Sequence, residues 1–247
     1  MTQASEASVA ELEIDLDSAE PIAQQLTRSL RRAIVTMRIA PGEMLSEQEI
    51  AKKLGISRQP VREAIFKLRE VGLIRVLPQR GTLVLKISQR AVEEARFVRE
   101  AVECAIVREA AELAGPAILE ELAATIERQR RAAEDNSAAS FFSLDEAFHQ
   151  LLAEAADRPS AWSIVEDVKP QMDRVRFLNV EGAAARKIII AHHLAILDAV
   201  RARDAAAAES AMRVHLRAII RSLPLTAQQH AHLFEDAQSD KKRRQRS

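Results

Sequence analysis

Apolar residues recur at every fourth position near the start of the chain: Ile22, Leu26, Leu30 and Ile34. This spacing puts the four side chains on one face of a helix, which we expect to run from Pro21 to about Arg38. A shorter helix over residues 47–54 follows, with its apolar residues again on one face. The pattern therefore predicts a small helical region at the start of the chain.

From residue 89 onward the spacing stays helical, and we identify no segment with the alternation of a strand. Turn-forming residues divide this region into six predicted helices. Their expected ranges are 89–114, 116–135, 138–157, 159–179, 182–202 and 204–222. Pro170 should kink the fourth helix, and residues 225–237 could pack as a short seventh. Loops this short make neighbouring helices antiparallel, so we predict an all-helical bundle.

Between these regions lies the order helix, tight turn, helix. Gly55 supplies the turn because it tolerates a positive φ, and Ser57 is a suitable N-cap for the second helix. Three polar side chains then lie at the start of that helix, namely Arg58, Gln59 and Arg62. Donors at the N-terminal end of a helix can enter the major groove of DNA. An ordinary helical hairpin with solvated arginines is the alternative.

A two-stranded wing is predicted directly after the second helix. Residues 73–77 are rich in β-branched side chains, residues 78–81 form a turn, and residues 82–85 form a second strand. Arg80 and Gly81 at the tip would allow close approach of the backbone to the minor groove, with a cation beside it. Helices and wing together predict a winged helix-turn-helix that binds double-stranded DNA.

Charge is distributed unevenly along the 247 residues, although the formal net charge is zero. Residues 1–20 carry six acids and no Lys or Arg, and we expect a disordered acidic arm there. Residues 21–88 carry 13 basic and 5 acidic residues, a net +8, whereas residues 89–237 carry 18 and 24, a net −6. Residues 238–247 are expected to form a basic, disordered tail. A basic domain beside an acidic one fits DNA binding by the first alone.

Cysteine usage and hydropathy bear on the compartment. The chain has one cysteine, so no internal disulfide can form, which suits a reducing cytoplasm. We find no signal peptide and no apolar run long enough to cross a membrane. We therefore expect a cytoplasmic protein without a membrane partner.

Four potential metal ligands lie in the helical region. Asp145 and His149 are four residues apart, which places them on one face of one helix. His193 and His215 lie equally far in sequence from Asp204, the expected turn between two antiparallel helices. They should therefore be neighbours at the same height, provided that both face inward.

Three imidazoles and a carboxylate in a dry core would be costly without a cation. The same set suits a divalent metal ion, with zinc first and nickel, manganese or iron as alternatives. A buried histidine by itself is more often a hydrogen-bonded core residue. The convergence of four such groups favours a metal site.

The segment PGEMLSEQEIAKKLGISRQPVREAIFKLREVGLI resembles the winged helix-turn-helix of GntR-type bacterial transcription regulators. The resemblance covers about residues 21–87. It implies DNA contacts from the following residues: Ser57, Arg58, Gln59, Arg62, Arg80 and Gly81. The chain has Gln48 where fatty-acid-responsive members have an arginine, so we expect a different operator sequence.

The pattern D-E-x-F-H followed by H-x-x-I-L-D-A and a later histidine is similar to the FCD ligand-sensing domain of the FadR subfamily. This resemblance covers about residues 90–222. It implies that Asp145, His149, His193 and His215 bind the metal and that a small carboxylate effector completes its coordination. Arg99 is our first candidate for the effector's carboxylate, with Arg174 and Arg176 as others.

Taken together, these features predict a homodimeric regulator that binds a palindromic operator. The expected fold is mainly α, with an N-terminal winged helix-turn-helix and a C-terminal FCD-like antiparallel bundle. Repression relieved by the effector is the favoured mode. One alternative is a direct metal sensor. Another is a metal-dependent hydrolase or lyase fused to a DNA-binding domain; we expect no enzyme, because no general base or nucleophile is readable beside the ligands.

Overall fold

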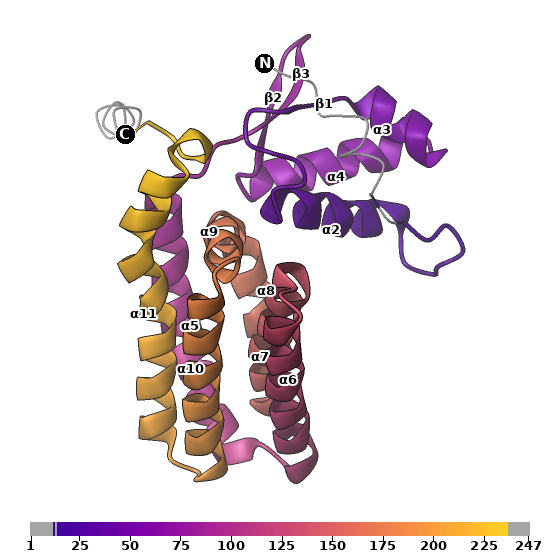
Figure 1. Cartoon of the computed structure of the whole chain (residues 1–247). Coiled ribbons are helices and arrows are strands. Elements are labelled where there is room, and N and C mark those ends of the chain that lie inside the picture. Colours follow the sequence, from indigo (N-terminus) through magenta and orange to yellow (C-terminus); the bar gives the residue numbers. More distant parts are fainter. Residues whose placement is uncertain (1–11, 13, 237–247) are drawn as a thin grey trace. The chain divides into compact units, whose positions relative to one another are not determined.

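The computed structural model describes residue 12 and residues 14–236, and Figure 1 shows its elements. The chain divides into two compact units. The first comprises residues up to Gln89 together with those from His230 onward, and the second comprises Arg90–Gln229. Each unit is described below by itself. Among the described residues, no helix is long and apolar enough to cross a membrane.

Within its described residues up to Gln89, the first unit contains three α-helices and a small sheet. They are α2 (Ile22–Val35), β1 (Met44–Leu45), α3 (Glu47–Leu54), α4 (Arg58–Glu70), β2 (Ile74–Leu77) and β3 (Gly81–Val84). The strands are antiparallel in the order β1-β3-β2, and Ile74 pairs with Val84. The predicted helix-turn-helix and wing are confirmed. Strand β1 was not predicted, because two residues carry no readable alternation.

Local sequence explains the boundaries of α3. Ser46 caps the helix, since its side chain accepts a hydrogen bond from the backbone N–H of Glu49 at 3.3 Å. Gly55 ends the helix in the left-handed region, at φ 66°. The apolar faces of the helices meet in one core, which includes Leu26, Leu30, Ile34, Ile50, Val61, Ile65 and Leu68. The side chains at the start of α4 stay outside that core.

The predicted acidic arm is partly ordered. Leu12 is buried in the core of the first unit, and Ile14 packs against it. Gln25 accepts a hydrogen bond from the backbone N–H of Asp15 at 2.7 Å. The prediction of disorder is therefore wrong for residue 12 and residues 14–20, because Leu12 and Ile14, which lie among the acidic residues, pack against other apolar side chains. The remaining residues of the arm, and the basic tail at 238–247, lie outside the described residues.

The second unit is all-helical within the part of the chain that is described. Its elements are α5 (Gln89–Leu113), α6 (Pro116–Glu134), α7 (Ala138–Ala155), α8 (Pro159–Val168), α9 (Pro170–Val180), α10 (Ala183–Arg201) and α11 (Ala205–Gln229). Figure 1 shows α5, α6, α7, α10 and α11 running alongside one another, with α9 near one end. The predicted antiparallel bundle is thus confirmed.

Two prolines behave differently from expectation. Pro170 ends one helix and starts another, so the predicted 159–179 helix is broken rather than kinked. Proline lacks an N–H and is favoured in the first turn of a helix, which explains the new start. Pro224, by contrast, lies inside α11, which continues to Gln229 instead of ending near residue 222. A short 3₁₀ helix, Ala231–Leu233, follows.

The end of the described chain belongs with the first unit. Ile87 forms a parallel bridge with Phe234, and the N–H of Ile87 donates to the carbonyl of Leu233 at 2.9 Å. Residues 230–236 were predicted to belong to the helical domain. The structure groups them with the DNA-binding unit instead, through backbone pairing that joins residues far apart in sequence.

Candidate functional site

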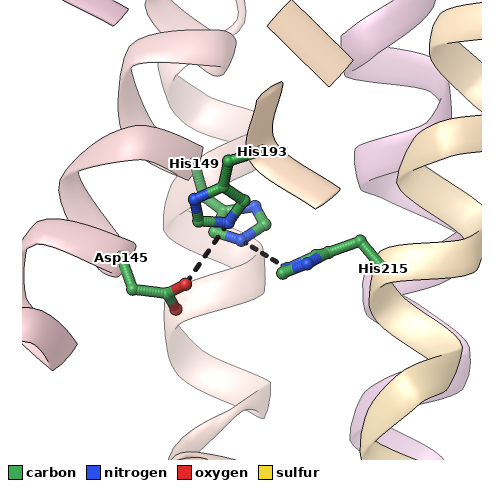
Figure 2. Close-up of side chains that lie close together, drawn as sticks. All are labelled: Asp145, His149, His193 and His215. Atoms are coloured by element: carbon green, nitrogen blue, oxygen red, sulfur yellow. Dashed lines mark hydrogen bonds and ion pairs between the residues drawn. The ribbon is translucent and has the colours of Figure 1, made fainter. Parts of the chain in front are cut away.

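The four predicted metal ligands converge inside the helical unit. Asp145 and His149 lie one turn apart on α7, His193 on α10 and His215 on α11, as Figure 2 shows. One ligand atom from each lies within 4.8 Å of all the others. The matched distances of His193 and His215 from the α10–α11 turn do make them neighbours, with ring centroids 4.8 Å apart.

The inward-facing atoms are the Nε2 nitrogens. His149 Nε2 lies 3.1 Å from His215 Nε2, and His193 Nε2 lies 3.3 Å from Asp145 Oδ1. Zinc is bound about 2.0–2.2 Å from nitrogen and carboxylate ligands, so a shared ion needs only small side-chain shifts. The set therefore presents three nitrogens and one oxygen to a single point.

Two further residues hold the outer nitrogens of the rings. Gln129 Oε1 on α6 lies 2.9 Å from His193 Nδ1, and Glu103 Oε2 on α5 lies 2.6 Å from His149 Nδ1. Such partners place the proton on Nδ1 and leave the Nε2 lone pair free for a metal. We did not single out either residue from the sequence. The only sequence feature that could have revealed Glu103 and Gln129 is the position of each polar residue on an otherwise apolar face of its helix.

Electrostatics favour the forms that bind metal. Burial raises the pKa of Asp145, but Arg176 and His193 outweigh burial and hold that pKa below its usual range. Burial lowers the pKa of His193 to about 3. Burial, together with His193 and His149, also keeps the pKa of His215 well below its usual value. The carboxylate is thus ionised, and these two imidazoles are neutral, at pH 7.

Unpaired atoms provide a test of whether a metal fits. Within the described part of the chain, His193 Nε2 and Asp145 Oδ1 are fully buried and have no hydrogen-bond partner. Buried polar atoms are normally paired, because an unpaired one costs free energy. His193 Nδ1 faces the acceptor Gln129 Oε1 and therefore carries the ring proton. As a result, the lone pair of His193 Nε2 faces a lone pair of Asp145 Oδ1. A divalent cation between them would satisfy both, so the residues fit a metal ion.

A cavity of about 210 Å³ adjoins this cluster. Its lining includes Asp145 and His215, together with Arg99, Arg176 and His192. His192 does not join the four ligands, but it lines the cavity, and its ring centroid lies 5.8 Å from that of His215. Charged and imidazole side chains next to the candidate ligands thus form part of the cavity wall.

Two of the three candidate arginines, Arg99 and Arg176, line the cavity, whereas Arg174 is buried and is not part of the lining. The side chain of Arg99 is 1 % exposed, and its Nε donates to Glu103. Its Nη2 is buried without a hydrogen-bond partner among the described residues. Arg176 also lines the cavity, but its guanidinium is held by Asp145, Glu146 and Asp173. A buried, incompletely paired guanidinium beside a metal site suits a carboxylate ligand.

The predicted DNA-contacting residues lie on exposed surface in the first unit. Ser57 precedes α4, and Arg58, Gln59 and Arg62 lie in its first two turns. Arg80 and Gly81 lie at the turn between β2 and β3. Gly81 adopts φ 100°, and an added Cβ there would meet the carbonyl oxygen of Leu45 at 3.2 Å.

Glu47 on α3 was not singled out from the sequence, yet it joins this set. Its Oε2 lies 3.3 Å from Arg58 Nη2 and 3.1 Å from Arg62 Nε. One carboxylate therefore holds both arginines at the start of α4. Glutamate in the first turn of a helix is favoured by the helix dipole, so its sequence position alone did not reveal this second role.

A winged helix-turn-helix, together with a helical domain that has a cavity beside four potential metal ligands, is typical of a DNA-binding, metabolite-responsive transcription regulator. Comparison with known proteins agrees. The profile of the bacterial regulatory proteins of the gntR family matches residues 22–84, and that of the FCD domain matches residues 94–218. The chain belongs to the GntR family of bacterial transcription regulators, in the group that carries an FCD domain.

Similar proteins include the HTH-type transcriptional repressor RspR of Escherichia coli (strain K12), which is 40 % identical over 91 % of this chain and 99 % of RspR. The gluconate operon transcriptional repressor of Bacillus subtilis (strain 168) is 26 % identical over 72 % of this chain and 74 % of that protein. Among solved structures, E. coli McbR/YncC has a TM-score of 0.75 at 22 % identity, covering 85 % of this chain and 99 % of McbR/YncC. That likeness supports the fold.

Proposed function

We propose that the protein is a homodimeric repressor whose FCD domain binds a small carboxylate beside a divalent metal ion, most plausibly zinc. One observation carries the proposal: an unpaired Arg99 Nη2 and the four converging ligands Asp145, His149, His193 and His215 lie next to one cavity. The metal would act as a Lewis acid toward a carboxylate oxygen. Arg99 would bind the same carboxylate by charge-assisted hydrogen bonds.

In the first unit, Ser57, Arg58, Gln59 and Arg62 would read the major groove, and Arg80 and Gly81 would approach the minor groove. The two-fold axis of a homodimer would match a palindromic operator in the cytoplasm. Effector binding would relieve repression if it favours a dimer arrangement with lower affinity for DNA. Relatives named as repressors support this direction.

The structure gives less support to the alternative hypothesis of a metal-dependent hydrolase or lyase than to a regulator. Glu146, the carboxylate next to Asp145 in sequence, is the natural candidate for a general base. Its two oxygens are held by Lys169 and Arg176, which leaves it poorly placed to accept a proton. Family relatives are transcription regulators, so we propose that the protein has no enzymatic activity.

The test is the melting temperature of the zinc-loaded protein with small carboxylic acids, because a ligand of the folded state raises it by mass action. We expect one acid to raise the melting temperature and to release operator DNA, and His215→Ala to abolish both zinc binding and the acid's effect. A large shift with metal alone and none with any acid would favour the direct metal sensor. Unchanged zinc stoichiometry in His215→Ala would reject the metal site.

A further inference from the structure

The cavity wall combines charged and apolar residues. Besides Arg99 and the candidate ligands, apolar side chains from three helices make up much of it: Met172 and Val180 from α9, Ile188 and Ile189 from α10, and Leu216 and Ile219 from α11. Met172 and Val180 are nearly inaccessible, whereas Ile188 is 54 % exposed. A ligand entering here would have its body surrounded by hydrocarbon.

The uncharged polar residues of the wall, Asn179 and Ser222, bond to each other and to neighbours. Asn179 Nδ2 donates to Ser222 Oγ at 2.8 Å, and Thr226 Oγ1 donates to Asn179 Oδ1 at 2.7 Å. Ser222 Oγ in turn donates to the carbonyl of Ile219 at 3.0 Å. These bonds engage the hydroxyl hydrogen of Ser222 and one donor and one acceptor site of Asn179, which leaves fewer sites for a ligand's hydroxyl groups. A hydroxyl buried here without a partner would lower affinity.

The volume limits the size of the occupant. A dry, apolar cavity of about 150 Å³ in a protein core binds benzene, so a cavity of 210 Å³ admits a small organic acid of somewhat larger size. The tail of such an acid would lie against Ile189, Leu216 and Ile219 and displace water from their surface.

We propose that the effector is a short monocarboxylate with an apolar tail, of the size of a six-carbon fatty acid or an aromatic acid, and not a polyhydroxylated acid. The inference rests on the proposed function, since Arg99 and the metal provide the binding site for the carboxylate. It adds the specificity: the walls of α9, α10 and α11 select the tail, while the charged side chains select the carboxylate.

Hexanoate and gluconate provide a matched pair of probes, because both have six carbons and one carboxylate and differ mainly in hydroxyl groups. We would titrate each into the zinc-loaded, full-length protein by calorimetry and record melting temperatures in parallel. We expect hexanoate to bind at least about 100-fold more tightly than gluconate, since discrimination based on a single hydroxyl already reaches about that ratio.

Two variants test the wall directly. Ile189→Ser replaces a half-buried wall residue and should weaken hexanoate binding by roughly tenfold or more, without loss of zinc. Ile164→Ser is the matched control, because it makes the same change at an exposed position on α8, and should leave hexanoate binding unchanged.

Gluconate binding that equals or exceeds hexanoate binding would overturn the inference while leaving the metal-and-carboxylate site intact. Absence of hexanoate binding to zinc-loaded protein would also overturn it. If hexanoate bound equally to zinc-loaded and metal-stripped protein, with affinity still lowered in Ile189→Ser, the tail specificity would stand. In that case the role of the metal in the proposed function would fail.

Discussion

At the scale of single residues, the structure assigns importance to side chains that orient others. Glu47 lies within 3.3 Å of two candidate DNA-contacting arginines, and Gln129 lies 2.9 Å from the outer nitrogen of a candidate metal ligand. Neither residue needs to touch DNA or metal to matter. Each limits the directions that a functional group can take, which reduces the ordering cost when the partner binds.

Replacing Glu47 by glutamine should reduce operator specificity. The variant removes the charge that holds Arg58 and Arg62, and it also removes a negative charge near DNA. We expect non-specific DNA affinity to rise and the specific-to-non-specific ratio to fall by about tenfold. Fluorescence anisotropy with operator and scrambled duplexes measures both. Glu70→Gln, at the far end of α4, is the control; equal effects of the two variants would contradict the role of Glu47.

Replacing Gln129 by leucine should weaken zinc binding by about 10- to 100-fold while the fold is retained, because His193 loses the acceptor at its Nδ1. Competition with a chromophoric chelator measures the zinc affinity. Thr125→Val is the matched control, since it changes another buried polar residue one turn earlier on α6. Zinc affinity equal to that of the unaltered protein would show that Gln129 does not position the ring.

At the scale of elements, a helix begins and ends where the sequence predicts when a single capping or helix-breaking residue sets the boundary. Gly55 ends α3, as the sequence predicts, and Ser46, which was not singled out from the sequence, caps its start. Proline is less readable, since Pro170 starts α9 while Pro224 lies within α11. Thr226, two residues beyond Pro224 on α11, donates a hydrogen bond to Asn179 on α9. Such long-range contacts are not visible in a local pattern.

Contact between α5 and α11 should depend on pH through Glu100. The hydrogen bond from Arg217 lowers the pKa of this carboxyl; burial opposes the shift, Arg213 adds to it, and the result is about 2. A pKa depressed in the folded state gives stability that is present above the unfolded value, near 4.3, and is lost as the pH falls toward 2.

Glu100→Gln should therefore lower the free energy of unfolding at pH 7 by about 1–2 kcal/mol, a figure reduced because Arg213 and Arg217 are partly exposed. At pH 3 the difference from the unaltered protein should shrink by about half. Urea unfolding at both pH values measures this. A difference that stays constant would mean that Glu100 acts through packing and not through its charge.

At the scale of the whole molecule, a basic DNA-binding segment is joined to an acidic sensing segment. Residues 21–88 carry a net +8 from 13 basic and 5 acidic residues, and residues 89–237 a net −6 from 18 and 24. This separation attracts DNA to one unit and repels it from the other. The candidate metal ligands and the candidate DNA contacts lie in different units, so an effector bound in one unit can alter DNA affinity only through a conformational equilibrium that both units share.

Two copies of the chain should bind one operator. For an operator selected from random duplexes, scrambling one half-site should weaken binding at least about 100-fold, because the second contact becomes non-specific. Scrambling the spacer between the half-sites is the control. Mobility shift and native mass spectrometry give affinity and stoichiometry. One chain per operator, with no loss from the scrambled half-site, would contradict the homodimer.

Spacing along the chain was enough to predict the class of fold, the winged helix-turn-helix and the two pairs Asp145–His149 and His193–His215. Each of these features depends on spacing along one helix or on distance from one turn, which are properties of one or two adjacent elements. Tertiary packing was needed to show that the two pairs converge and which other distant side chains meet them. It brought Glu103 and Gln129 to the cluster, built the apolar wall from α9, α10 and α11, and ordered Leu12 in the first core. These contacts join residues far apart in the chain, and local periodicity carries no information about them.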